Sequence, residues 1–239
     1  MKKRLVLIKH ESASHGDRAS AHLAERGFEI DWRRPYAGDS LDDLKNGGAE
    51  DLAGTILYGG PQNAPDSHIH PYLADEARWV EACIERGVPT LGICLGGQIL
   101  AHTLGAEVGP HKDGIHEFGY YPVHPTEAGR TDFLPEELTV VQAHFHEFQL
   151  PAGAELLATS ELFERQAFRY GDSAYAVQFH PEVTIPGMRR WQEAEWAPWG
   201  EPGAQSREEQ DRLGARHDAR QHAWFTNFLD GLFGRPHSE

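Results

Sequence analysis

The stretch Thr90–Leu100, TLGICLGGQIL, is the most informative part of the chain for its fold. It joins an apolar run, Val88–Ile93, to a helical pattern, Leu95–Leu104, that Gly105 ends. The run is typical of a buried strand and the pattern is typical of a helix. Cys94 falls on the turn between them. A strand that passes directly into a helix is the repeating unit of a parallel sheet covered by helices.

The same alternation fills the first half of the chain. Short apolar runs predict buried strands, and longer patterns predict helices, at Arg4–Lys9, Asp17–Arg26, Phe28–Trp32, Thr55–Tyr58 and Pro71–Arg86 in chain order. From about Ile115 the sequence becomes rich in turns, and we expect strands at Tyr120–Val123, Leu138–Ala143, Ala167–Tyr170 and Ala174–Phe179. The expected fold is α/β: an open, mostly parallel twisted sheet flanked by helices, with a partly antiparallel second half.

We expect residues 1–239 to form one domain with a helical C-terminal extension over about 187–239. Helices are predicted near Met188–Trp196 and around Ser206–Leu232. The polar middle of the second helix is interpreted either as a solvated face or as a mobile flap. Its apolar end, AWFTNFLDGLF, is expected to pack on the core.

Composition excludes several classes of protein. The formal net charge of −15 disfavours binding to nucleic acid, because an acidic surface repels phosphate. Two cysteines in a chain of this size do not form a disulfide framework. The opening apolar run is too short for a signal peptide, and no run approaches the ~20 residues of a membrane span. We therefore expect a soluble, cytoplasmic protein.

Gly92-Ile93-Cys94-Leu95-Gly96 has the form G-x-C-x-G between a strand and a helix, which is the context of a nucleophile elbow. Glycines allow neighbouring backbone to approach closely, and the helix start provides unpaired N–H groups that favour a thiolate. The N–H of Leu95 is placed to stabilise an oxyanion. The pentapeptide alone is equally compatible with a buried structural cysteine.

Gln178-Phe179-His180-Pro181-Glu182 follows the last predicted strand. Active residues of parallel sheets lie at such strand ends, so His180 is a candidate base for Cys94. Pro181 restricts His180 to an extended conformation, and Glu182 is placed to orient the imidazole. Cys–His–Glu is the nucleophile, base and orienting group of a thiol triad. Gly59-Gly60-Pro61 also ends a predicted strand, and its Gly60 N–H is a candidate second oxyanion donor.

The segments GICLGGQ, YGGPQNAP and QFHPE, in the positions described, resemble those of the class I (Triad) glutamine amidotransferases. Glu117–Val123 resembles the E-x-G-W-x-P-V segment of stand-alone members, and Glu164–Gly171 resembles their N-Q-A-F-R-x-G segment. The likeness covers roughly Thr55–Thr184. It indicates the stand-alone group similar to the amidotransferase domain of GMP synthase, and it implies a flavodoxin-like fold.

The resemblance also implies roles for individual residues. Cys94 would attack the side-chain amide of glutamine, His180 would act as base and Glu182 would orient it, so that glutamate and ammonia form through a γ-glutamyl thioester. The backbone N–H groups of Gly60 and Leu95 would form the oxyanion hole. Gln98 would help to hold the substrate. We expect no cofactor and no metal. Either a separate synthetase receives the ammonia, or the protein hydrolyses a γ-glutamyl compound in its own right.

The sequence departs from the family pattern at Ala143–Glu147, where stand-alone members often carry W-H-G-D. His144 matches, whereas Ala143, Phe145 and His146 do not, so the substrate-side or partner-side surface is expected to differ. His144 and His146 could share a strand face, but two histidines without further ligands nearby do not predict a metal site.

Two alternative functions stay open. A γ-glutamyl hydrolase or peptidase would share the fold and triad, but such relatives commonly carry Arg where this chain has Leu95. A non-catalytic protein of the DJ-1/PfpI type would usually carry His there and would lack His180-Pro181-Glu182. No ATP-binding loop of the SGGxDS form occurs, so this chain is not expected to make GMP alone.

Overall fold

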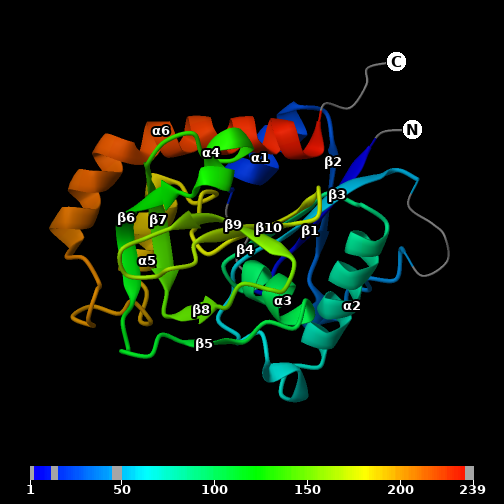
Figure 1. Ribbon diagram of the computed structural model, residues 1–239, viewed down its shortest axis with the longest axis horizontal. Helices are drawn as coiled ribbons and strands as arrows, with labels where there is room; N and C mark the ends of the chain where they lie inside the picture. The colour runs from blue at the N-terminus through cyan, green and yellow to red at the C-terminus, as the bar shows by residue number, and fades with distance from the viewer. Residues whose placement is uncertain (1–2, 12–15, 45–49, 235–239) are drawn as a thin grey trace.

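The computed structural model describes residues 3–11, 16–44 and 50–234 (Figure 1). Its strands are β1 Arg4–Ile8, β2 Glu29–Arg33, β3 Leu52–Leu57, β4 Thr90–Ile93, β5 Val108–Pro110, β6 Glu117–Pro125, β7 Leu138–His144, β8 His146–Phe148, β9 Ala154–Thr159, β10 Ala167–Tyr170 and β11 Ala174–Val177. Its α-helices are α1 Arg18–Glu25, α2 Tyr72–Glu85, α3 Leu95–Thr103, α4 Glu127–Asp132, α5 Ile185–Gln192 and α6 Arg207–Phe233, and two 3₁₀ turns are η1 Pro35–Ala37 and η2 Asp66–His68.

In the described part of the chain, nine strands form one sheet in the order β2-β1-β3-β4-β11-β10-β9-β6-β7. The pairs from β2 to β11 are parallel, and the pairs from β11 to β7 are antiparallel. β5 and β8 form a separate antiparallel pair. The expected α/β fold with a partly antiparallel second half is therefore confirmed.

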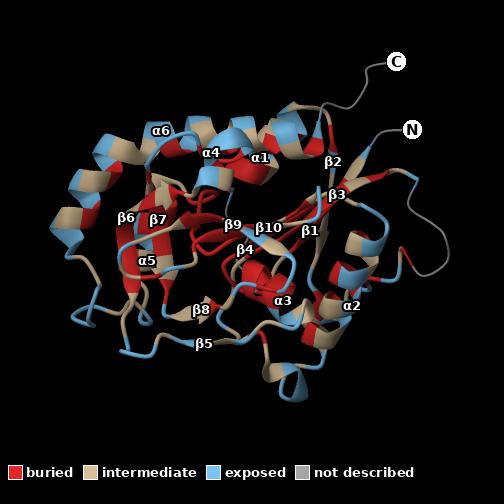
Figure 2. Cartoon of the chain, viewed as in Figure 1, coloured by how far each residue is buried: buried red, intermediate tan, exposed pale blue. Residues whose placement is uncertain are grey.

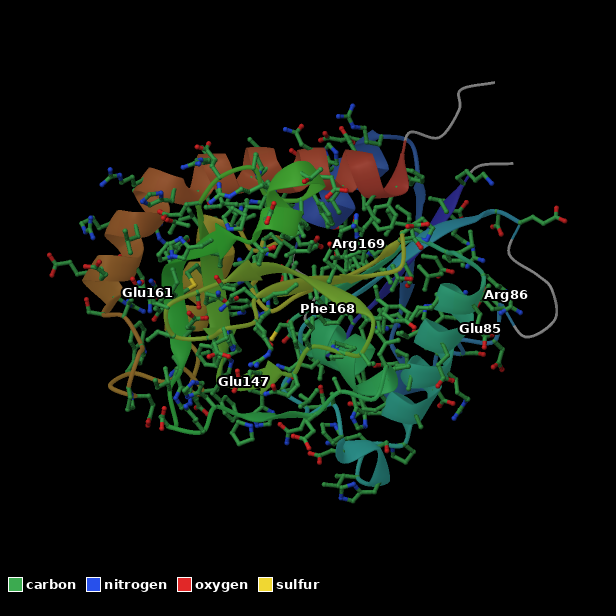
Figure 3. The ribbon with its side chains drawn as sticks, in the orientation of Figure 1. Glu85, Arg86, Glu147, Glu161, Phe168 and Arg169 are labelled. Atoms are coloured by element: carbon green, nitrogen blue, oxygen red, sulfur yellow. The ribbon has the colours of Figure 1, made fainter. Side chains whose placement is uncertain are left out.

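Helices cover both faces of the sheet, and β1 shows why. Leu5 and Leu7 belong to one core with residues of α1 and α6, whereas Val6 and Ile8 belong to another with residues of α2 and α3. Successive side chains of a strand point to opposite faces, so a fully apolar strand requires a cover on each side. Figures 1 and 2 show α1, α4 and α6 on one side of the buried strands and α2 and α3 on the other. Figure 3 shows Phe168 of β10 inside this body and Glu85 and Arg86 at its periphery.

The C-terminal helices differ from the sequence prediction. α5 begins at Ile185 rather than Met188, because Thr184 caps it by accepting a hydrogen bond from Gly187 N at 3.2 Å and Pro186 fits the first turn. It ends at Gln192, so Trp196 lies in the following loop.

The polar middle of α6 has an exposed outer face, as one of the two interpretations expected, and its inner face is docked, so it is not a flap. Gln210 and Gln221 are fully buried there. Gln221 Oε1 accepts a hydrogen bond from Val141 N of β7 at 2.7 Å, and Gln210 Nε2 donates one to Phe118 O of β6 at 3.0 Å. The apolar end of α6 packs on the core as expected, through Phe225, Leu229 and Phe233. Residues 235–239 of the predicted extension lie outside the described residues. No helix in the described ranges is long and apolar enough to cross a membrane.

Candidate active site

The candidate site residues meet at the carboxyl edge of the parallel strands. Gly59 and Gly60 follow β3, Cys94 follows β4, and His180 comes three residues after β11. The contacts at Gly59 are so close that an added Cβ would lie 2.7 Å from His180 Cε1 and 3.5 Å from Cys94 Cβ. β4 lies between β3 and β11 in the sheet, so three segments distant in sequence deliver their polar groups to one place.

Cys94 adopts a strained backbone conformation. Its φ is 50° and its ψ is −108°, and it is the only residue besides glycine with positive φ in the described part of the chain. Such a conformation costs about 1–3 kcal/mol and persists only where the surroundings enforce it. Here a Cβ on Gly92 would lie 2.5 Å from Gly96 O, and a Cβ on Gly96 would lie 2.1 Å from Leu57 O. The flanking glycines therefore allow α3 to start directly against β3 and β4.

Cys94 is the N-cap of α3, and Leu95 is the first helical residue. The N–H groups of the first helical turn have no partner inside the helix, and they give this end a partial positive charge. Cys94 is 7 % exposed, whereas Cys83 in α2 is fully buried. Burial raises the pKa of the Cys83 thiol to about 12, although Thr90 acts in the opposite direction. Of the two cysteines, only Cys94 is both partly exposed to solvent and placed at the start of a helix.

His180 and Glu182 form a buried pair. His180 Nδ1 lies 2.9 Å from Glu182 Oε1, and the two residues are 4 % and 5 % exposed. The segment is held by its backbone: His180 N donates to Val141 O at 2.8 Å, and Arg18 N donates to Glu182 O at 3.1 Å. The other imidazole nitrogen makes no contact with Glu182, and the ring lies close to Cys94, since an added Cβ on Gly59 would touch both side chains.

Burial and charge act oppositely on His180. Burial disfavours the imidazolium, but the carboxylate of Glu182 and the sulfur of Cys94 favour it more strongly, so the pKa of His180 is raised to about 10. A protonated imidazole is the partner that a cysteine requires in order to act as a thiolate nucleophile.

Trp191 of α5 is a site residue that sequence reasoning missed. Its indole meets the His180 ring edge to face, with centroids 4.8 Å apart and an interplanar angle of 79°. An aromatic ring in this position limits rotation of the imidazole and interacts favourably with its cation. No motif marks Trp191, because only the fold of the C-terminal segment brings it to His180.

Gln98 lies one turn into α3 and is 3 % exposed. Its Nε2 donates to Gln178 Oε1 at 3.2 Å and to His146 O at 3.4 Å. The side chain therefore links the elbow helix to the segment before His180 and to the start of β8.

Three segments noted for their family resemblance meet in one buried network. Glu117 is fully buried and contacts His144 Nε2 at 2.9 Å, Gln166 Nε2 at 2.8 Å and Ser160 Oγ at 2.9 Å. The other ring nitrogen of His144 lies 2.9 Å from His146 O. His144 and His146 belong to different strands, β7 and β8. No group of three or more His, Cys, Asp and Glu residues that could hold a metal occurs within the described ranges.

His10 and Glu76 form another buried pair, below the Gly59–Gly60 turn. Their side chains are fully buried, and His10 Nε2 lies 2.8 Å from Glu76 Oε2. His10 follows β1 and Glu76 lies in α2. Neither residue belongs to a recognisable motif, and nothing in the sequence relates their positions.

A model of the family described as glutamine amidotransferase class-I matches residues 11–189, which include all the residues of the predicted triad. The chain belongs to the class I glutamine amidotransferase family. Among curated relatives of this amidotransferase, the glutamine amidotransferase-like protein YfeJ of Salmonella typhimurium is 32% identical over 194 residues, which cover 77% of this chain and 78% of that protein. The GMP synthase of Campylobacter lari is 32% identical over 188 residues, but only 34% of its length is matched.

Solved structures agree with the family. A glutamine amidotransferase from Thermotoga maritima superposes with a TM-score of 0.83 at 27% identity, covering 98% of this chain and 99% of the other. A glutamine amidotransferase from Methylobacillus flagellatus has the same fold, with a TM-score of 0.87, 23% identity and coverage of 100% and 97%. The expected resemblance to stand-alone amidotransferases is confirmed.

Proposed function

We propose that this amidotransferase hydrolyses the side-chain amide of glutamine through Cys94, His180 and Glu182. The observation that carries the proposal is the position of His180, whose ring is held by a buried carboxylate and lies close to Cys94, a strained helix N-cap. His180 holds the thiol proton, and the Cys94 thiolate attacks the amide carbon, so that its electron pair forms the S–C bond as the C=O π electrons move to oxygen. The C=O bond then re-forms, the C–N bond breaks, and His180 gives its proton to the leaving nitrogen, which departs as ammonia and leaves a γ-glutamyl thioester.

The second half of the reaction reverses the roles. Water attacks the thioester carbon while His180 removes a water proton, and the thiolate leaves as glutamate forms. The N–H groups of Leu95 and Gly60 stabilise the oxyanion in both steps. Gln98 helps to position the substrate, and Glu182 holds the imidazole in the required orientation.

We further propose that ammonia passes to a separate synthetase. The GMP synthases of Campylobacter lari and Neisseria gonorrhoeae match this chain over 34% and 26% of their own length, so the similarity covers only part of each of those proteins. A cytoplasmic location stays a prediction.

The test is release of glutamate and ammonia from glutamine by the purified chain. Cys94→Ser and His180→Ala should each abolish release. Cys83→Ser should retain it, because Cys83 lies on the buried face of α2 in the hydrophobic core. Comparison of glutamine with γ-glutamyl amines separates an amidotransferase from a γ-glutamyl hydrolase. If neither is hydrolysed and a glutamine-like chloroketone does not alkylate Cys94, the proposal is wrong and a non-catalytic role gains support.

A further inference from the structure

In the described part of the chain, three buried histidines each contact the carboxylate of a glutamate: His10 with Glu76, His144 with Glu117 and His180 with Glu182. They differ in what the second ring nitrogen meets. For His10 and His144 it is a backbone carbonyl, whereas the side chain of His180 bonds to no backbone carbonyl of the described residues and its ring lies near Cys94. The first two pairs therefore have no free nitrogen for proton transfer, but each can hold a piece of backbone.

The carbonyl that faces His10 belongs to Gly59, at 3.3 Å from Nδ1. A carbonyl oxygen only accepts hydrogen bonds, so Nδ1 carries a proton in this contact. The remaining proton of the pair lies between Nε2 and Glu76 Oε2. A carboxylate at Nε2 would leave a lone pair on Nδ1 of a neutral ring, so an N–H at Nδ1 requires this second proton on the pair, and Glu76 provides the buried partner for it.

Gly59 O and the N–H of Gly60 belong to one peptide unit. That peptide is trans, so its C=O and N–H point in opposite directions from one plane. A donor that fixes the carbonyl of Gly59 therefore also fixes the direction of the Gly60 N–H. Two consecutive glycines otherwise permit this peptide to rotate, because neither has a Cβ to restrict φ.

Packing strengthens the same restraint. A Cβ on Gly60 would lie 2.5 Å from His10 Cβ, and one on Gly59 would lie 2.7 Å from His180 Cε1. The Gly59–Gly60 turn is thus enclosed between His10 on one side and His180 on the other.

We propose that His10, held by Glu76, is a positioning residue that keeps the Gly59–Gly60 peptide oriented so that the Gly60 N–H faces the oxyanion formed at Cys94. The inference rests on the proposed function, in which Gly60 is an oxyanion donor. The pair acts through the peptide and touches no reacting atom. Because an oxyanion donor acts in the transition state, loss of the pair should lower kcat and leave KM nearly unchanged.

A matched pair of double variants tests this role. His10→Leu with Glu76→Gln removes the donor to Gly59 and leaves no buried charge without a partner. His10→Asn with Glu76→Gln introduces a side chain with the same branching as leucine, but it places an amide N–H near the position of imidazole Nδ1. His10→Gln in the same background directs its amide toward residue 76 instead, so it is a second variant without a donor to Gly59. Urea denaturation establishes that each variant is folded.

We expect kcat for glutamine to fall by about 10-fold to 100-fold in the Leu variant, since loss of an oxyanion donor costs up to about 10²–10³-fold. KM should change less than about twofold, and the Asn variant should recover most of kcat. Glutamate γ-semialdehyde, whose carbonyl accepts Cys94 Sγ and a proton to form a tetrahedral hemithioacetal, should bind the Leu variant more weakly by the same factor. Glutamate itself should bind both variants alike.

A folded Leu or Gln variant with wild-type kcat would overturn the inference, as would equal losses in the Leu and Asn variants. Crystal structures provide a test that does not need turnover. The Gly59–Gly60 peptide should be rotated, or present in two orientations, in the Leu variant and unchanged in the Asn variant. An unchanged peptide in both would contradict the inference. Failure of the proposed function itself is distinct, because it appears as wild-type protein that neither hydrolyses glutamine nor binds the aldehyde.

Discussion

At the scale of single residues, the charge of His180 is the central property of the site. Burial alone would lower its pKa, and the carboxylate of Glu182 is the largest influence that raises it, so the final value is about 10. The carboxylate therefore has two consequences: it orients the ring through the 2.9 Å contact, and it keeps the ring protonated beside the thiol.

Glu182→Gln should separate these two consequences. The amide keeps a hydrogen-bonding group near Nδ1 but removes the charge, so we expect the pKa of His180 to fall and kcat to decrease by about 10²–10⁴-fold. Histidine NMR titration of the wild type and the variant measures the shift. His217 of α6, whose pKa is lowered by burial and by neighbouring arginines, is the internal reference. An unchanged His180 titration would contradict the assignment.

The raised pKa of His180 also makes the stability of the fold depend on pH. The folded-state pKa of His180 lies above its ordinary value of 6.5, so the stabilisation by its proton is complete below pH 6.5. It is lost as the pH rises from 6.5 through about 10. In Glu182→Gln this alkaline loss should be smaller and should occur at lower pH, which urea denaturation across the pH range measures.

At the scale of elements, the start of α3 depends on the absence of a side chain at Gly96. A Cβ there would lie 2.1 Å from the backbone oxygen of Leu57, which cannot move without disturbing β3. We expect Gly96→Ala to destabilise the fold by about 1–3 kcal/mol, the usual cost of overpacking, and to inactivate the enzyme. Gly231→Ala in α6 is the matched control, because its Cβ meets open space and alanine favours helix by about 1 kcal/mol. Thermal unfolding of both variants checks the opposite signs.

The helix α6 holds the antiparallel part of the sheet through buried amides. Gln221→Leu would leave the buried N–H of Val141 without the acceptor that it now has at 2.7 Å. We expect a loss of about 1–3 kcal/mol in the free energy of unfolding, the cost of an unsatisfied buried group. The neighbouring His222→Leu, on the exposed face, should change it by less than about 0.5 kcal/mol. Equal effects in urea denaturation would show that Gln221 has no special role.

The same elements show what sequence can and cannot predict. The apolar run Leu5–Ile8 and the glycine-flanked turn at Cys94 determine their own local structure, so the parallel half of the sheet was predictable. The placement of Cys94 and His180 at the same edge of that sheet was predictable for the same reason. β9, with the sequence AELLAT, was missed because alanine, glutamate and leucine favour helix, and its strand form comes from pairing with β10 and β6. Trp191, His10 and Glu76 were missed for a related reason: each meets the site only through tertiary contacts.

At the scale of the whole molecule, ion pairs join the first and last helices. Burial disfavours the charge of Asp230 in α6, but hydrogen bonds from His22 of α1 and from Arg26 at its C-cap, at 2.8 and 2.9 Å, outweigh it and lower the pKa of Asp230. A depressed pKa stabilises the fold above the ordinary value of 3.8, and the stabilisation is lost as the pH falls through the lower folded-state value. Asp230→Asn should therefore reduce stability at pH 7 and make acid unfolding less steep. The exposed Asp172→Asn is the control, and identical acid profiles of the two variants would contradict the role of the pair.

The two ends of the described chain lie at the edge of the sheet opposite Cys94. β1 begins there at Arg4, and Phe233 at the end of α6 packs against Gly54 near the start of β3. Figure 1 shows both ends on the same side of the molecule. An affinity tag, a surface anchor or a fluorescent label attached at either end would thus leave the carboxyl edge open. Immobilised protein should retain its full turnover, and the site could be screened for bound substrates on a sensor chip in a single defined orientation.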